Sequence, residues 1–215
     1  MLKHLFLLLV RWSIYISLPF VLLIRGGVYL HRHFYVHAWL TVLGGVAMAS
    51  VVLLLYWTVI QRRLFPGKSM EQSKFTVLLV FLVVAAYGFQ SAFYLAQNHA
   101  KTDAIHAEFT ELHPLLRLSV STVILLDRKV LITDASRLPE DYKRMGMSSR
   151  KQSLHYRQQD GYTHAMDLRT KGEPAWRNTL LQAYFRIMGF NTLRHGGSND
   201  HLHVSLISWD RPGSI

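Results

Sequence analysis

The chain has no cysteine among its 215 residues. No disulfide therefore links its parts, and no thiolate is available as a nucleophile or as a metal ligand. Internal repeats and low-complexity segments are also missing. The formal net charge is +11, but the Lys and Arg residues after position 98 are spread out, without a basic run or an interleaved aromatic ladder. Nucleic acid is thus not an expected partner, whereas an anionic envelope surface is compatible with this charge.

Charged side chains are nearly missing from three long stretches of the first hundred residues. Residues 5–24 contain one charge, Arg11, while residues 38–60 and 75–97 contain none. Each stretch reaches the roughly 20 residues that a helix needs to cross a hydrocarbon core about 30 Å thick. The sequence therefore predicts three transmembrane helices, in a membrane domain that covers residues 1–97.

A cleaved signal peptide is the alternative interpretation of the first stretch, with Lys3 as its basic start. It fits less well, because the apolar run is long and an Arg-Gly-Gly sequence at 25–27 follows it in place of a small-residue cleavage site. We therefore expect a retained helix. His31, His33 and His37 come next, and we expect them in a solvated connector at the membrane surface rather than in a metal site.

The distribution of basic residues favours a cytoplasmic amino terminus. The second connector, residues 61–74, carries four Lys and Arg residues, whereas the first connector, residues 25–37, carries two. Lys and Arg are enriched in cytoplasmic loops, and Lys3 lies on the same side as the richer loop. With three spans, residues 98–215 then form an exported domain on the periplasmic or extracytoplasmic side of a bacterial inner membrane.

The exported domain is predicted to begin with a helix, a strand and a second helix. Apolar residues at helical spacing cover much of residues 104–126, with a break near Pro114. Residues 129–136 are a short β-rich run. A helix is then expected to begin with Pro139 in its first turn and to end near Gly146.

The remainder of the domain is predicted as a hairpin, a helix and a second hairpin. Residues 153–170 read as two strands about an Asp160-Gly161 turn, and residues 191–209 read as strand, Gly-Gly loop and strand. Between them, Pro174 and Gly189 bound a helix. Its expected core-facing stripe is Trp176, Leu180, Leu181, Tyr184, Ile187 and Met188. The fold class is therefore α+β, with helices packed on a small antiparallel sheet.

The two predicted hairpins contain residue types that suit a catalytic zinc site. Such a site needs three protein ligands, an open position for water, and a nearby carboxylate to take the proton of that water. The first hairpin offers His155 and Asp167, and the last strand offers His203 with Asp200 three residues before it. His201 and His203 share one strand face. His155 lies across from Asp167 if the hairpin loop has three residues and out of register if it has two.

The order S-x-H, A-x-D and D-x-x-H resembles that of the zinc peptidases of the D-alanyl-D-alanine carboxypeptidase and dipeptidase group. These enzymes share a fold with the amino-terminal signalling domain of hedgehog proteins. Ser153 and His155 match the start of the family's first motif, Ala165 and Asp167 match its end, and "DHLHVSL" at residues 200–206 resembles the second motif. The resemblance covers about residues 112–208 and does not extend to the three apolar stretches.

The resemblance implies roles for six residues. The implied zinc ligands are His155, Asp167 and His203. Asp200 stands where the family has its acidic general base, and His201 where some branches carry another His. Arg137, in "DASRLPEDY", stands where the family uses an Arg to hold substrate or polarise the scissile carbonyl. A structural ion pair with Glu140 or Asp141 is the alternative role for Arg137.

The first motif departs from the family in its spacing. His155 precedes Asp167 by 12 positions, a longer interval than in the family, and Thr163 replaces the usual Gly before Ala165. We interpret the surplus as a lengthened hairpin around Asp160. His164 is the competing ligand, but in a strand it has the opposite parity to Asp167 and is expected to face away.

These observations together predict a membrane-anchored zinc metallopeptidase, a hydrolase acting on peptidoglycan stem peptides in the manner of a D-Ala-D-Ala carboxypeptidase or endopeptidase. The substrate class comes from the resemblance and from the outward topology. The alternative is a non-hydrolytic envelope protein that uses the same fold to bind peptidoglycan or a membrane partner. Neither the bond that is cut nor the oligomeric state follows from the sequence.

Overall fold

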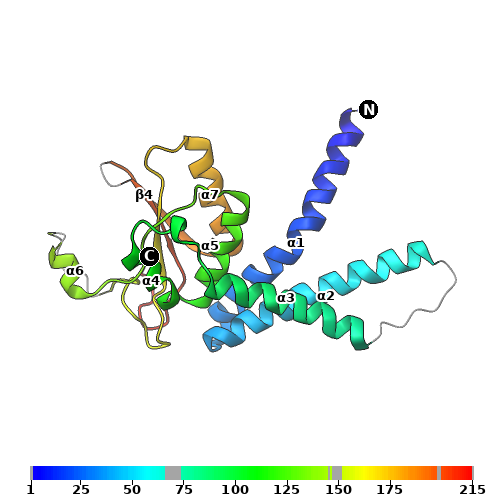
Figure 1. The fold of residues 1–215 in the computed structure, drawn as a ribbon, viewed down its shortest axis with the longest axis horizontal. Helices are drawn as coiled ribbons and strands as arrows, with labels where there is room; N and C mark the ends of the chain where they lie inside the picture. Colours follow the sequence, from blue (N-terminus) through cyan, green and yellow to red (C-terminus); the bar gives the residue numbers. More distant parts are fainter. Residues whose placement is uncertain (1, 66–73, 145, 147–151, 198–199, 215) are drawn as a thin grey trace.

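A computed structural model describes residues 2–65, 74–144, 146, 152–197 and 200–214. Its first part consists of three long helices, α1 (Leu2–Phe34), α2 (Ala38–Leu64) and α3 (Lys74–Phe93). Each is long and apolar enough to cross a membrane, as predicted. Figure 1 shows the three helices extending to one side of a mixed domain, with α1 diverging from α2 and α3 toward its amino terminus.

Helix α1 continues well beyond its apolar stretch and reaches the mixed domain. His31 and His33 therefore lie in a helix instead of the expected connector, although His33 is exposed to solvent as expected, and His37 is exposed in the link. His31 is buried against the mixed domain, where its Nε2 is 2.9 Å from the carbonyl oxygen of Ile207. The described structure leaves residues 35–37 as the link between α1 and α2.

Helices α1 and α2 pack closely because small residues line their contact. A Cβ atom added at Gly45 would lie 2.0 Å from the backbone oxygen of Leu23, so only glycine allows this approach of the two backbones. Ala49, one turn further along α2, is also buried in the contact. Gly45 thus packs α2 against α1 as small residues do at helix contacts in membranes.

Replacing Gly45 by alanine is expected to destabilise the helical bundle by about 1–3 kcal/mol, because the added methyl group meets rigid backbone. The matched control is Gly88→Ala in α3, where the new methyl group would lie 3.5 Å from Val46 Cγ2, an ordinary contact. Thermal unfolding of the full chain in detergent micelles measures both variants. Equal midpoints for the two variants would contradict the close approach of α1 and α2.

The mixed domain is built on a four-stranded antiparallel sheet with the order β1-β2-β4-β3. The strands are β1 (Ile132–Asp134), β2 (Ala165–Arg169), β3 (Asn191–His195) and β4 (His201–Ser205). The helices are α4 (Asp103–Glu108), α5 (Pro114–Leu126), α6 (Pro139–Arg144) and α7 (Ala175–Met188), with short 3₁₀ turns at Gln97–His99 (η1) and Phe109–Glu111 (η2). The predicted α+β architecture is confirmed.

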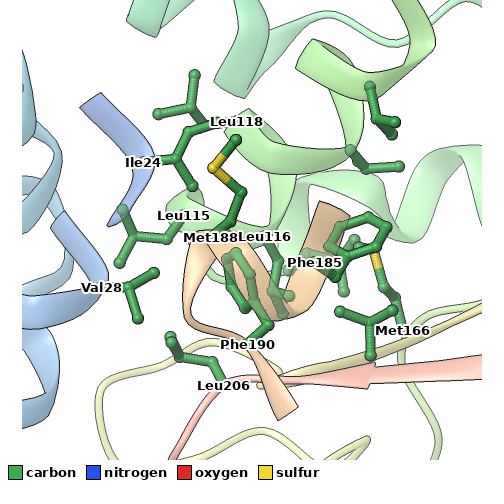
Figure 2. Packing of buried hydrophobic residues seen from close by; sticks show 14 of the residues in the cluster. Ile24, Val28, Leu115, Leu116, Leu118, Met166, Phe185, Met188, Phe190 and Leu206 are labelled. Carbon is green, nitrogen blue, oxygen red and sulfur yellow. The ribbon is translucent and has the colours of Figure 1, made fainter. Parts of the chain in front are cut away.

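One hydrophobic core joins the sheet, α5, α7 and the carboxy-terminal part of α1. Figure 2 shows Ile24 and Val28 of α1 beside Leu115 and Met188, all within the same cluster of buried side chains. The sheet contributes its core face through Met166, Leu168, Leu202 and Val204, which are buried. The mixed domain is therefore packed directly on the helical bundle and is not merely tethered to it.

Most predicted elements of the domain are confirmed, but the first hairpin is wrong in part. The break at Pro114, the helix that ends at Gly189 in a left-handed conformation (φ 97°) and the last hairpin are all present. Residues 153–164, in contrast, form turns with isolated bridges from Thr163 to Arg157 and to Leu112, and β2 pairs with β1 and β4. His155 therefore lies in a loop and not in a strand.

The predicted core stripe of α7 is also wrong in part. Leu181 and Met188 are buried as expected. Trp176, Leu180 and Ile187, however, are 67%, 61% and 56% exposed. Helix α7 thus has two apolar faces, of which the sheet and α5 cover one.

Candidate metal centre

Three buried side chains converge on one point beside the sheet. His155 Nε2 lies 3.3 Å from His203 Nδ1 and 3.4 Å from Asp167 Oδ1, and His203 Nδ1 lies 2.8 Å from the same carboxylate oxygen. A tetrahedral zinc ion with bonds of about 2.0–2.1 Å holds its ligand atoms roughly 3.3–3.4 Å apart. Two of the three separations already match this spacing. The three residues, at most 7% exposed, form a group that can hold a metal ion.

Asp167 and His203 are held by the two central strands. In the β2–β4 ladder they are directly opposite each other, so their side chains leave the same face of the sheet. Because β2 and β4 each have a partner strand on both sides, neither position lies at a sheet edge. The two ligands therefore have fixed backbones, which favours a preorganised site.

His155 reaches the site from a loop that is held by hydrogen bonds at three points. Its Nδ1 lies 2.8 Å from the carbonyl oxygen of Ala135, and its own carbonyl accepts a bond from the N–H of Arg137. The hydroxyl of Ser153 accepts the N–H of His155 at 3.2 Å, a local turn of the kind that Ser favours. This bond gives a physical reason for the Ser of the S-x-H motif.

These hydrogen bonds also place the protons of the two histidines. A carbonyl only accepts, so in the neutral form of His155 the hydrogen is on Nδ1 and Nε2 turns a lone pair toward the cluster, the arrangement common to metal-binding histidines. His203 Nδ1 lies close to two acceptors, Asp167 Oδ1 and His155 Nε2. It therefore carries a hydrogen, which it donates to the nearer of them, Asp167 Oδ1. A metal ion entering the site would replace this one proton.

The carboxylate of Asp167 is the electrostatic centre of the site. Burial alone raises its pKa, but His155 and His203 outweigh burial, so the pKa of Asp167 lies well below its ordinary value. Arg137 Nη2 lies 2.7 Å from its second oxygen, and His201 Nε2 lies 3.6 Å from that oxygen. Asp167 is therefore ionised and bound on both sides by possible cations.

Of the three residues predicted to assist catalysis, the structure brings two to the cluster. Arg137 and His201 both face Asp167, and the side chain of His201 is 20% exposed, more than that of any of the three converging residues. Asp200 is placed elsewhere: its carboxylate accepts two bonds from Arg194 at 2.9 Å and one from Thr170 Oγ1 at 2.6 Å. The role of Asp200 as proton acceptor stays a prediction. Its bonds to Arg194 and Thr170 do not favour that role.

Asp134 is a member of the site that the sequence did not single out. It pairs with Arg137 at 2.9 Å, so that this guanidinium bridges the carboxylates of Asp134 and Asp167. Burial raises the pKa of Asp134. Tyr142 extends the network, because its hydroxyl accepts from Arg137 Nη1 and lies 2.6 Å from Ser153 Oγ. The D-x-x-R spacing of Asp134 and Arg137 is the signal from which this pair was predictable.

His164, the competing ligand, belongs to a second group with His113 and Asp160. There its Nε2 lies 2.8 Å from Asp160 Oδ2 and its Nδ1 lies 3.2 Å from the carbonyl of Ile207, so both nitrogens already have partners. His113 Nδ1 accepts the N–H of Leu115, which leaves the hydrogen on Nε2, the atom that faces the group. His113 Nε2 lies 3.8 Å from Asp160 Oδ2, wider than the spacing of zinc ligands, so the second group matches a metal site less well than the first.

The described residues thus contain two groups that can hold a metal ion, of which the cluster of His155, Asp167 and His203 has the better geometry. Two imidazoles and one carboxylate suit zinc and also other divalent transition metals. Comparison of the chain with protein-family models, with curated proteins and with solved structures gives no match. The chemistry of the centre is therefore inferred from its own side chains.

Proposed function

We propose that this chain is a membrane-anchored zinc hydrolase that cleaves an amide bond in peptidoglycan stem peptides. The observation that carries the proposal is the convergence of His155 Nε2, Asp167 Oδ1 and His203 Nδ1 in a buried cluster beside a guanidinium. The motif resemblance supplies the substrate class. Three helices that can span a membrane support a position of the domain beside a bilayer, and the excess of basic residues in the second connector supports an exported domain.

The site faces away from the membrane helices, which supports a substrate in the envelope rather than in the bilayer. Asp167 and His203 alternate along their strands with the side chains of the core face of the sheet. That core face packs on α7, and α5 lies between the sheet layer and helices α1, α2 and α3. The ligands consequently leave the opposite, membrane-distal face of the sheet.

Each residue of the centre then has a defined task. His155, Asp167 and His203 would hold the ion, which supplies a Lewis acid and lowers the pKa of a bound water when present. Arg137 is fixed by Asp134 and Asp167 and presents positive charge beside the site, where it stabilises a developing oxyanion or a substrate carboxylate. His201, partly exposed and 3.6 Å from Asp167 Oδ2, would accept and return a proton.

The test uses the zinc-loaded full chain in detergent with stem peptides ending in D-Ala-D-Ala, and mass spectrometry to detect products. The unchanged protein is expected to release a product, and His201→Gln is expected to keep its zinc but lose about 10²–10⁴-fold in rate, the usual contribution of a general acid or base. Asp200→Asn is the matched comparison. If it, and not His201→Gln, stops cleavage with zinc retained, then Asp200 is the proton acceptor.

A non-hydrolytic role is the second candidate, and the position of Asp200 favours it. The carboxylate that the motif offers as general base is held by Arg194 and Thr170, outside the cluster. A protein that uses the metal centre only to bind peptidoglycan would take up one zinc ion, retain muropeptides on the zinc-loaded chain and release no product. That combination would refute the hydrolase.

A further inference from the structure

We propose that α7 and the end of α5 form a membrane-docking surface that rests on the leaflet of the bilayer nearest to the mixed domain. The proposal concerns how the domain is held at the membrane and does not depend on the hydrolytic activity. It begins from the apolar face of α7 that neither the sheet nor α5 covers.

The uncovered face of α7 is a continuous stripe. Trp176, Leu180 and Ile187 are separated by four and seven residues, which at about 100° per residue places them within an arc of about 40°. All three are more than half exposed. The buried side of the helix is formed by Leu181, Phe185 and Met188. A stripe of this kind, with a Trp among aliphatic residues, is typical of a helix that lies in a membrane surface.

The carboxy-terminal end of α7 is attached to α1 where the apolar span ends. Arg25 Nη1 donates to the carbonyl oxygen of Ile187 at 2.5 Å, and Gly189 lies against Val28. The residues of α1 before Arg25 form the apolar stretch that can cross a membrane. Ile187 is therefore held at the level where the first span leaves the hydrocarbon core. In Figure 1, α7 rises from this contact along the edge of the domain that faces the amino-terminal half of α1.

The amino-terminal end of α7 adjoins a second exposed apolar pair at the end of α5. Arg177 Nε lies 2.6 Å from Asp127 Oδ2, which fixes the two helix ends together. Leu125 and Leu126, directly before Asp127, are 64% and 81% exposed. The apolar surface thus extends from Ile187 along α7 to Trp176 and on to the end of α5.

Charge around this surface fits a lipid headgroup layer. Arg128, Lys129, Lys171 and Arg186 flank the stripe in the sequence, while the nearby acids, Asp127 and Glu173, are paired with Arg177 and Lys129. Basic residues beside an apolar stripe favour an anionic membrane surface. Because the surface is continuous with a membrane-spanning helix, its expected occupant is the bilayer rather than a second protein.

The missing cysteines make a direct test possible, since a single introduced cysteine can be labelled without background. The full chain carrying Leu180→Cys and a bimane label is placed in nanodiscs that contain anionic lipid. The control is Leu138→Cys, which is similarly exposed, 62% against 61%, but lies next to α6, the helix that Figure 1 shows far from α1–α3. Nitroxide-bearing lipids and aqueous iodide serve as the two quenchers.

The label at position 180 is expected to be quenched several-fold more by the lipid nitroxide than the label at 138, and several-fold less by iodide. Equal iodide quenching at both positions would overturn the proposal, because the stripe would then face water. Protection from both quenchers at position 180 would also overturn it, because a protein partner would then cover the stripe. Adding Trp176→Ser and Ile187→Ser to Leu180→Cys is expected to reduce lipid quenching while zinc content stays unchanged.

Discussion

Asp167→Asn is expected to remove stoichiometric zinc binding while leaving the fold in place. The carboxylate is one of three converging ligands and the only negative one, and it draws together His203, His155 and Arg137. Asparagine has the same shape, and its single amide oxygen can accept from either His203 or Arg137, which bind different oxygens of the Asp167 carboxylate. It lacks the charge that offsets a divalent ion, so we expect the affinity to fall by about 100-fold or more, beyond the effect of losing an outer-sphere partner.

Metal analysis and zinc titration of the full chain in detergent measure this loss. Asp200→Asn is the matched control, because it changes a carboxylate of the second motif that binds Arg194 instead of the cluster. The control is expected to retain one equivalent of zinc. If Asp167→Asn retains one equivalent with unchanged affinity, the converging side chains are a hydrogen-bonded network and not a metal centre.

The position of His155 shows why the site was easier to predict than its local structure. The motif order placed His155 with Asp167 and His203, and the structure brings the three together. The predicted strand around His155 is absent, because this segment is held by the carbonyl of Ala135 and the hydroxyl of Ser153. Bonds to a residue 20 positions away leave no periodic pattern in the sequence.

Asp200 shows the opposite case, in which strand geometry was the better guide. It precedes His203 by three residues, an odd interval, so an extended chain turns the two side chains to opposite faces. The structure accordingly pairs Asp200 with Arg194 and Thr170. The same parity rule places His201 with His203 on the face of the sheet that carries Asp167, and His201 is found there. Parity thus accounts for both placements, while the resemblance suggested a different one for Asp200.

The apolar stripe of α7 marks a limit of hydropathy patterns. Periodicity identified the helix and its end at Gly189 correctly, because a period near 3.6 residues and a left-handed glycine are local signals. It assigned Trp176 and Ile187 to the core together with Leu181. A pattern shows that a face is apolar but not whether protein or lipid covers it, and in a chain with membrane helices both are available.

Arg137→Met is expected to lower the free energy of unfolding of the zinc-free chain by about 3–5 kcal/mol, the usual cost of removing one partner of a buried ion pair. Arg137 bridges Asp134 at 2.9 Å and Asp167 at 2.7 Å, and the side chain of Asp167 is only 4% exposed. Methionine fills a similar volume but leaves two neighbouring carboxylates without their shared cation. Zinc would neutralise Asp167 from its other side, so the loss is expected to shrink when zinc is bound.

Denaturant unfolding of the full chain in detergent, with chelator and then with zinc, measures both effects. Arg157→Met is the matched control, since the side chain of Arg157 is 63% exposed and lies 3.9 Å from Glu111, a surface pair worth at most about 1 kcal/mol. With chelator, similar losses for the two variants would show that Arg137 does not balance buried charge. A large loss for Arg137→Met that zinc leaves unchanged would show that the guanidinium stabilises the fold without sharing Asp167 with a metal ion.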